Sequence, residues 1–199
     1  MEISAKIVKE LREQTGAGMM NCKQALKDND GDFEKALKAL RLKGMATADK
    51  KSSRDANEGI IDCYIHTGNK LGILIEVNCE TDFVARREEF KELVRNVAMQ
   101  IASNPDVAII STDDISDNIR TQEWEFEINK PDLANKPEEI KNKIVEGRVN
   151  KALNSKVLLE QSYIREPNIT VGELIKQKIA LLGENIKVKR FIRYELGGE

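Results

Sequence analysis

The stretch from residue 71 to residue 101, LGILIEVNCETDFVARREEFKELVRNVAMQI, changes its hydrophobic period halfway along. In its first half every second residue is apolar, which is typical of a half-buried β-strand. In its second half the apolar residues recur at spacings of three and four, which predicts an amphipathic helix. The two sets are Leu71, Ile73, Ile75, Val77 and Cys79, and Phe90, Leu93, Val94, Val97 and Ile101. A strand leading directly into a helix indicates a sheet with a helix packed against one face.

The corner between the two halves is Thr81-Asp82-Phe83-Val84. Thr81 or Asp82 is suited to cap the new helix, because each side-chain oxygen can accept from an unpaired first-turn N–H group. Phe83 has two interpretations. It lies seven residues before Phe90, so on one continuous helix both would face the core. At the first turn, it could instead project from the domain and fill a pocket on a partner. The spacing does not separate these alternatives.

The first 45 residues predict three short helices separated by turns at residues 15–18 and 28–31. Ser4 and Asp32 are placed to cap the first and third helices, and Gly44 to end the third. The inward-facing residues would be Ile7, Val8, Leu11, Cys22, Ala25, Leu26, Phe33, Ala36, Leu37 and Leu40. This is a UBA-like three-helix bundle. A core this small is marginally stable, so a docking module is a natural use for it.

Two adjacent methionines, Met19 and Met20, follow the glycine-rich turn after the first helix. Neighbouring residues on a helix cannot both face its core, so at least one of them should be exposed. A flexible thioether at a turn offers an adaptable contact surface. The alternative is one core methionine beside an ordinary surface methionine.

We expect two domains: a helical docking module over residues 1–54, ending in a basic linker, and a core domain over residues 55–199. The core domain is predicted to be α+β, with a small antiparallel sheet covered by helices. Its expected strands are 61–65, 71–79 and 186–194, with a short edge strand at 107–110. Its further helices are expected around Trp124, from Pro137 onward, and from Thr170 to Gly183.

Composition narrows the classes of function. The chain has 199 residues, a net charge of −2 and 40% hydrophobic residues. This near-neutral balance argues against nucleic-acid binding as the main role. No apolar run reaches membrane-spanning length, and the first residues suggest neither a signal nor a transit peptide. The three cysteines form no metal-binding or disulfide pattern and favour a reducing compartment.

No catalytic or metal site is predicted. Cys63 and the sole histidine, His66, are an odd number of residues apart on one expected strand, so they point to opposite faces. No phosphate-binding P-loop or dinucleotide fingerprint is present. We therefore expect no cofactor and no metal, and a hydrolase is disfavoured. A binding protein remains, either one that changes its partner's state or a helix-bundle adaptor that only tethers.

Three segments resemble one family. They are VNCETDFVAR (77–86), TGAGMMNCKQAL (15–26) and GENIKVKRFIRYELG (183–197), which together resemble elongation factor Ts, the guanine-nucleotide exchange factor of the translation GTPase elongation factor Tu. The resemblance implies that Phe83 wedges into the GTPase beside its Mg²⁺ and phosphate region. Asp82 would make the adjacent polar contact within the corner Thr81 to Val84. It also implies docking through Met19, Met20 and Lys23, and that the metal belongs to the partner.

The resemblance also concerns assembly and location. Longer family members carry a second related subdomain, for which this chain has no room, so we expect a homodimer or a two-to-two complex with elongation factor Tu. The residues Glu160-Gln161-Ser162-Tyr163 depart from the Gln-Pro-Phe often found in the family, which puts partner contacts there in doubt. The expected compartment is a bacterial cytoplasm or a plastid stroma.

Overall fold

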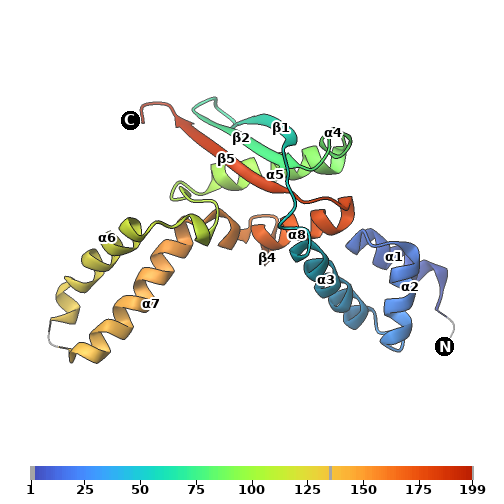
Figure 1. Cartoon of the computed structure of the whole chain (residues 1–199), viewed down its shortest axis with the longest axis horizontal. Coiled ribbons are helices and arrows are strands. Elements are labelled where there is room, and N and C mark those ends of the chain that lie inside the picture. The colour runs from blue at the N-terminus through green and yellow to red at the C-terminus, as the bar shows by residue number, and fades with distance from the viewer. Residues whose placement is uncertain (1–2, 135, 199) are drawn as a thin grey trace. The chain divides into compact units, whose positions relative to one another are not determined.

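The computed structural model describes residues 3–134 and 136–198 and is α+β, as predicted (Figure 1). Two compact units make up the chain. The first contains the chain up to Ala98 together with the segment from Glu173 onward, and the second contains Met99–Gly172. The first unit holds the helical bundle, the main sheet and the Thr81–Val84 corner.

The predicted three-helix bundle is confirmed. Its helices are α1 (Ala5–Thr15), α2 (Met19–Asp28) and α3 (Phe33–Asp49). Ser4 and Asp32 cap α1 and α3, because their side chains accept hydrogen bonds from Ile7 N and Lys35 N. The buried core consists of Val8, Leu11, Cys22, Ala25, Leu26, Ala36, Leu37 and Leu40.

The predicted end of the third helix near Gly44 is wrong, since α3 continues to Asp49. Gly44 has a different role. A Cβ atom at this position would lie 3.3 Å from the Cβ of Ala180, so glycine allows α3 to approach the later helix α8 (Val171–Leu182) closely. The predicted basic linker therefore begins as helix and leaves it only after Asp49.

Three antiparallel strands form the main sheet in the order β1-β2-β5, which confirms the predicted small antiparallel sheet (Figure 1). They are β1 (Glu58–Ile65), β2 (Leu71–Cys79) and β5 (Lys187–Glu195). A tight turn joins β1 to β2, and its Gly68 and Asn69 have φ values of 93° and 56°. Such left-handed angles are accessible to glycine and tolerated by asparagine.

The inner face of the sheet is the core that the alternation predicts. Ile73, Ile75, Val77 and Cys79 of β2 are buried. The next helix, α5 (Glu88–Ser103), passes behind the sheet and buries Phe90, Leu93, Val94 and Val97 (Figure 1). An ion pair also joins α5 to the sheet, since Arg95 Nε of α5 lies 3.9 Å from Asp62 Oδ2 of β1. The period change read from the sequence thus marks a real strand-to-helix unit.

A separate short helix, α4 (Asp82–Ala85), precedes α5. The interpretation of one continuous helix through Phe83 and Phe90 is therefore wrong. The chain leaves helical pairing at Arg86 and Arg87 and re-enters it at Glu88. Seven-residue spacing consequently does not place Phe83 on the same face as Phe90.

The second unit contains the antiparallel pair β3 (Ser162–Tyr163) and β4 (Glu166–Thr170), which were not predicted. It also contains helices α6 (Asp117–Ile128) and α7 (Glu138–Lys156), which confirm the helices expected around Trp124 and after Pro137. Short 3₁₀ turns occur at Thr112–Asp114, Pro131–Leu133 and Leu158–Glu160. The cluster Leu133, Val145, Val149 and Leu153 is buried between the two helices, and half-buried apolar side chains surround it.

The segment at 107–110 differs from the prediction, whereas the last helix agrees with it. No strand forms at 107–110; Ile109 makes an isolated parallel bridge to Val157, and backbone hydrogen bonds join residues 108–110 to residues 156–159, a pairing too short to make a strand. The helix expected to follow a capping box at Thr170 is α8, which begins at Val171 directly after Thr170, the last residue of β4. Its predicted end at Gly183 is confirmed within one residue.

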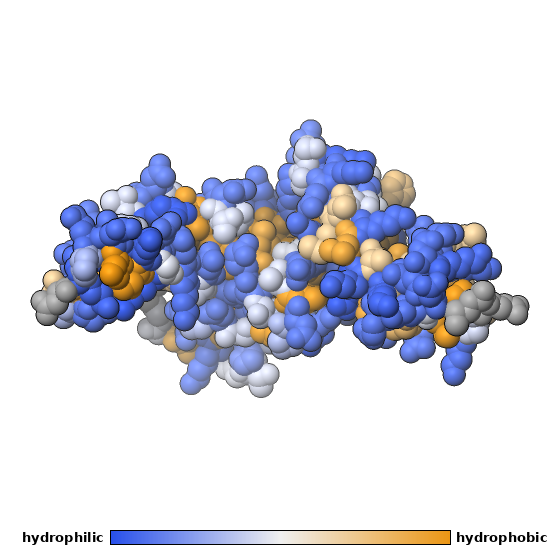
Figure 2. Space-filling view, turned by 90° about the horizontal axis from the view of Figure 1, so that it is seen from below, coloured by the Kyte–Doolittle hydropathy of each residue, from blue (hydrophilic) through white to orange (hydrophobic). Residues whose placement is uncertain are grey.

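The face of the molecule visible in Figure 2 is largely hydrophilic, with apolar side chains in small separate patches. None of the helices in the described part of the chain is both long and apolar enough to cross a membrane.

Candidate functional site

The Phe83 side chain is 78% exposed, on the short helix that follows the central strand. Its neighbours Val84 and Ala85 are only 6% and 5% exposed. One turn of helix thus buries two small residues and turns the large one outward. The interpretation of Phe83 as a core residue is wrong, and the projecting interpretation describes its position. A single exposed apolar side chain is common on protein surfaces, so exposure alone assigns no role.

Asp82 is also at the surface, where its Oδ2 accepts a hydrogen bond from Arg86 Nη2 at 2.7 Å. The pair spans one turn of helix and is well exposed, so it contributes little to stability. It does hold the carboxylate beside Phe83. A partner that reached Phe83 would therefore also meet a carboxylate already facing a guanidinium.

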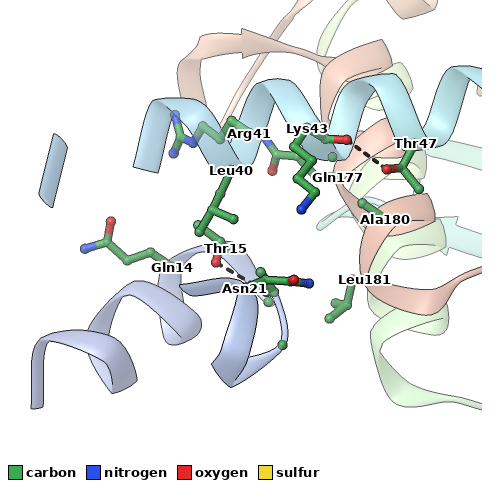
Figure 3. A pocket seen from close by; sticks show the side chains of 14 residues that line it. Gln14, Thr15, Asn21, Leu40, Arg41, Lys43, Thr47, Gln177, Ala180 and Leu181 are labelled. Carbon is green, nitrogen blue, oxygen red and sulfur yellow. Dashed lines mark hydrogen bonds between the residues drawn. The ribbon is translucent and has the colours of Figure 1, made fainter. Parts of the chain in front are cut away.

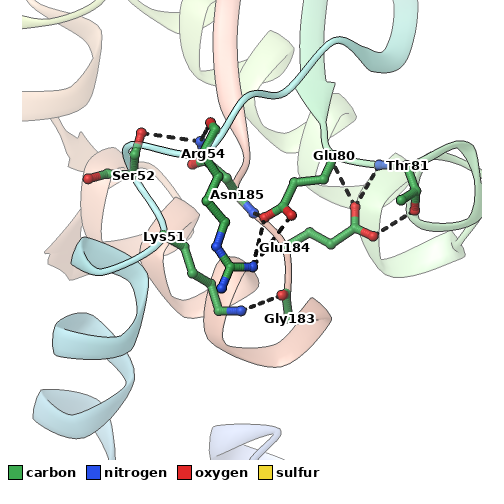
Figure 4. A network of polar contacts seen from close by, with 8 residues as sticks. All are labelled: Lys51, Ser52, Arg54, Glu80, Thr81, Gly183, Glu184 and Asn185. Atoms are coloured by element: carbon green, nitrogen blue, oxygen red, sulfur yellow. Dashed lines mark hydrogen bonds and ion pairs between the residues drawn. The ribbon is translucent and has the colours of Figure 1, made fainter.

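Thr81 or Asp82 was predicted to cap the helix; Thr81 precedes α4 without a side-chain capping bond, and Asp82 is the first residue of α4. The Thr81 hydroxyl instead donates to Oε1 of Glu184 at 2.6 Å. The other carboxylate oxygen, Oε2, accepts from the backbone N–H groups of Thr81 at 2.9 Å and Glu80 at 3.1 Å (Figure 4). One carboxylate from the segment between α8 and β5 thus satisfies three donors at the corner. The distant partner outcompetes the local cap, because charged acceptors form the stronger hydrogen bonds.

Cys79 supports the corner from beneath. Its thiol is fully buried and donates to the carbonyl oxygen of Thr81 at 3.1 Å. Burial raises the pKa of the Cys79 thiol to about 11, and the nearby negative charge of Glu184 acts in the same direction. The thiol therefore remains protonated, and able to donate, at neutral pH.

A further set of contacts surrounds Glu80. Its Oε1 accepts from Asn185 N at 2.6 Å and lies 3.5 Å from Nη1 of Arg54. The side-chain amide of Asn185 donates to the carbonyl oxygens of Arg54 at 2.7 Å and Ser52 at 3.3 Å (Figure 4). Asn185 is 1% exposed, so these bonds satisfy a buried polar group. The corner is thereby joined to the segment that follows α3.

Met19 and Met20 begin α2 and are 41% and 77% exposed. The alternative of one core methionine is therefore wrong. Lys23 is also exposed. It lies four residues after Met19 and three after Met20, which places it on the same side of the helix as both. Gly18, the residue before the helix, provides no side-chain cap. The three side chains form an apolar and basic surface, which we call the methionine surface.

A cavity of about 270 Å³ lies beside this region, between the helical bundle and α8 (Figure 3). Thr15, Gly16, Arg41 and Leu181 are among the residues that line it. Leu181 points toward Gly16, where a Cβ atom would come within 2.6 Å of the leucine Cδ1. The cavity includes none of the corner residues and neither methionine. We interpret it as a gap in the packing between the bundle and α8.

The described residues contain no group of three or more side chains arranged to hold a metal ion. His66 Nδ1 lies 3.0 Å from the Tyr64 hydroxyl, and Cys63 is exposed on β1. β1 ends at Ile65, so His66 lies just beyond the strand on which the prediction placed it.

Sequence reasoning missed Glu184, Asn185, Glu80 and Arg54. Two of them lie in the segment GEN at 183–185, which belongs to one of the three resembling stretches but received no role. A charged residue in a turn is usually solvated, so the pattern alone offered no signal for a contact across more than 100 residues of chain.

Comparison with known proteins identifies the family. The family model for elongation factor Ts matches residues 2–198. The chloroplastic elongation factor Ts of Phaeodactylum tricornutum is 68% identical, over 98% of this chain and 97% of the relative. Those of Rhodomonas salina (chloroplastic) and Synechococcus elongatus are 62% and 60% identical over 98% of this chain, covering 90% and 89% of the relatives. The chain therefore belongs to the elongation factor Ts family, the non-catalytic nucleotide exchange factors of elongation factor Tu.

Proposed function

We propose that this chain exchanges nucleotide by seating the corner Thr81–Val84 beside the Mg²⁺ and phosphate region of elongation factor Tu bound to GDP. Phe83 wedges between partner side chains, and Asp82 makes the adjacent polar contact that disturbs metal coordination indirectly. GDP then leaves and GTP can load. The observation that carries this proposal is the exposed Phe83 side chain on a helical turn anchored by buried Val84 and Ala85.

The mechanism is one of linkage. The factor must bind the nucleotide-free GTPase more tightly than the GDP-bound form, and GDP must weaken factor binding by the same ratio. Accelerating GDP release ten-thousand-fold requires that the factor stabilise the nucleotide-free GTPase preferentially by about 5.5 kcal/mol, because each tenfold change in rate corresponds to about 1.4 kcal/mol. Burial of one Phe side chain supplies about 1.5–3 kcal/mol. Phe83 is therefore insufficient alone, and other contacts must also favour the open state.

Those other contacts come from docking. In this proposal residues 1–54 form the docking module and residues 55–199 the core domain that carries the corner. Met19, Met20 and Lys23 contact the GTPase, and two features support this assignment: both methionines are exposed, and the lysine lies on the same side of α2. Thioether side chains adapt to an irregular partner surface, and the lysine adds a contact to an acidic group.

The test is release of a fluorescent GDP analogue from elongation factor Tu on addition of the chain, compared with the Phe83→Ala variant. The wild type should act at substoichiometric amounts. Phe83→Ala should slow GDP release by about ten- to a hundredfold, because the variant loses the free energy of burying the Phe side chain in the partner, about 1.5–3 kcal/mol. Since Phe83 is exposed, the melting temperature should stay close to that of the wild type. Binding without acceleration would favour the tethering adaptor instead.

We also propose that the outer face of the main sheet binds a second copy of this chain. The face carries exposed apolar side chains from three adjacent strands, among them Ile61, Ile65, Leu74, Ile192 and Tyr194. Strand pairing places Cys63, Leu74 and Ile192 directly beside one another, which makes the apolar area contiguous. A contiguous apolar area of this kind on a sheet commonly marks an interface.

Light scattering tests the dimer, alone and in complex with elongation factor Tu. The wild type should have twice the mass of one chain, or form a two-to-two complex. Leu74→Lys should convert it to a monomer, because a charge placed in the middle of the interface loses its water without gaining a partner. Lys38→Glu, on the surface of the helical bundle, is the control and should leave the mass unchanged. A monomeric wild type in both measurements excludes the dimer.

The proposed compartment is a plastid stroma or a bacterial cytoplasm. The relatives named above are chloroplastic proteins of algae and a protein of a cyanobacterium.

A further inference from the structure

An exposed wedge requires a fixed direction if it is to enter a partner in one geometry. Phe83 has no packing of its own to supply this, since its side chain is mostly solvent-exposed. The helix that carries it has a single turn, Asp82–Ala85, and isolated short helices are not stable in water. The direction of Phe83 must therefore be set by the backbone on which this turn rests.

That backbone is fixed by Glu184. Its carboxylate accepts from the N–H groups of Glu80 and Thr81 and from the Thr81 hydroxyl, at 3.1, 2.9 and 2.6 Å (Figure 4). Thr81 is the residue immediately before α4, so its orientation determines where the helical turn points. Hydrogen bonds to a charged acceptor are shorter and stronger than those between neutral groups.

We propose that Glu184 is a positioning residue for nucleotide exchange, which holds the corner so that Phe83 enters elongation factor Tu in the productive orientation. This inference rests on the role proposed above for Phe83. Glu184 itself does not touch the partner's nucleotide. It acts through the three hydrogen bonds at residues 80 and 81.

The neighbouring contacts extend this function to the rest of the first unit. Asn185 adjoins Glu184 and bonds to the carbonyl oxygens of Ser52 and Arg54, while its own N–H group donates to Glu80. The segment after α3 and the corner are thus held by consecutive residues of one turn. Docking of the helical bundle and insertion of Phe83 are consequently linked through a short polar network.

The test measures GDP release over a range of factor concentrations for Glu184→Ala and Glu184→Gln. Glu184→Ala should lower the maximal release rate about tenfold, since it removes charge-assisted hydrogen bonds that fix the corner. The concentration giving half-maximal rate should change much less, because the methionine surface is intact. Glu184→Gln should recover most of the rate: its oxygen can accept from both N–H groups, and its NH₂ group can donate to the Thr81 hydroxyl.

Glu92→Ala is the matched control, since Glu92 is an exposed carboxylate of the same unit with one long ion pair to Lys178 at 3.8 Å. Glu92→Ala should exchange nucleotide as the wild type does.

If Glu184→Ala does not fold, Thr81→Val replaces it in the assay. This variant removes only the hydroxyl contact and should lower the maximal rate by about two- to fivefold.

A double-variant cycle with Phe83→Ala separates positioning from general stabilisation. If Glu184 acts through Phe83, then adding Glu184→Ala to Phe83→Ala should slow release little further. Fully additive losses, or a normal maximal rate for Glu184→Ala, would overturn the inference while leaving the role of Phe83 intact. A normal rate for Phe83→Ala itself would overturn the proposed function.

Discussion

Two of the places where the first unit displays apolar side chains to solvent are built in opposite ways. At the corner, Phe83 stands on one helical turn whose preceding residue, Thr81, uses its N–H, hydroxyl and carbonyl groups in bonds to Glu184 and Cys79. On the methionine surface, α2 begins after Gly18 with no side-chain cap, and both Met19 and Met20 are flexible. One place is fixed by a polar network; the other is adaptable.

This difference indicates that the two places have different roles in nucleotide exchange. An aromatic residue on a backbone held in one orientation binds best to one geometry of the partner, so it suits the step that favours the nucleotide-free form. A flexible pair gains contact area without demanding one geometry, so it suits binding. We therefore expect variants of the corner to change the maximal rate of exchange, and variants of the methionine surface to change the concentration at which exchange occurs.

The largest expected effect comes from removing both thioethers. The double variant Met19→Ala, Met20→Ala should raise the half-maximal concentration by about ten- to a hundredfold, given about 1.5–3 kcal/mol for a fully buried methionine and only partial burial here. The maximal rate should be unchanged. Both quantities come from the same titration of fluorescent-GDP release. A lowered maximal rate would show that the two places do not divide the work as described.

A smaller effect should distinguish shape from hydrophobicity. Phe83→Leu keeps an apolar side chain but loses the flat ring. It should lower the maximal rate about three- to tenfold, because the loss of buried area is equivalent to about one or two methylene groups. Met20→Leu should leave both parameters within about twofold, since Leu and Met exchange readily where packing is adaptable. Equal sensitivity at both positions would contradict the contrast between a fixed and an adaptable surface.

Replacement of the acid at the corner should cost less. Asp82→Ala removes the polar contact beside Phe83 and frees Arg86, and should lower the maximal rate about two- to fivefold. Combined with Phe83→Ala it should add less than its separate effect, because neighbouring residues act as one unit. Lys91→Ala, which breaks another exposed ion pair of similar geometry, to Glu88, is the control and should behave as the wild type.

The smallest effect concerns pH. Because burial raises the pKa of Cys79 to about 11, its neutral thiol stabilises the folded corner fully below the ordinary thiol pKa of 9.0. That contribution should be lost as pH rises through about 11, when the thiolate can no longer donate to Thr81. At pH 8, alkylation with iodoacetamide followed by mass spectrometry should modify exposed Cys63 well before Cys79. Equal rates would show that the corner opens readily.

Periodicity was sufficient to predict most of the fold. The alternation of β2 and the helical spacing of α5 are properties of neighbouring residues, and both elements form where predicted. The continuous helix through Phe83 was wrong because the break at Arg86 and Arg87 has no glycine or proline to reveal it. The strand expected at residues 107–110 failed because strand formation depends on a partner that the local pattern does not specify.

The candidate site was predictable only in part. The corner and the methionines were visible as unusual apolar residues beside turns, and the family resemblance suggested their roles. The cap expected from Thr81 was wrong because a carboxylate far along the chain takes its hydroxyl. Contacts of this kind depend on the register of β5 beside β2, which no local pattern contains.

The sequence distance between Thr81 and Glu184 has a consequence for how the protein is made. The strand that follows Glu184, β5, pairs with β2 and lies more than a hundred residues after it in the chain. A ribosome synthesises the corner more than a hundred residues before it synthesises the carboxylate that holds it. Contacts so distant in sequence form late, because loop closure must precede them. Nascent chains should therefore present α1, α2 and α3 folded while Phe83 still lacks its fixed orientation, and the corner becomes competent only after Glu184 and β5 have left the ribosome.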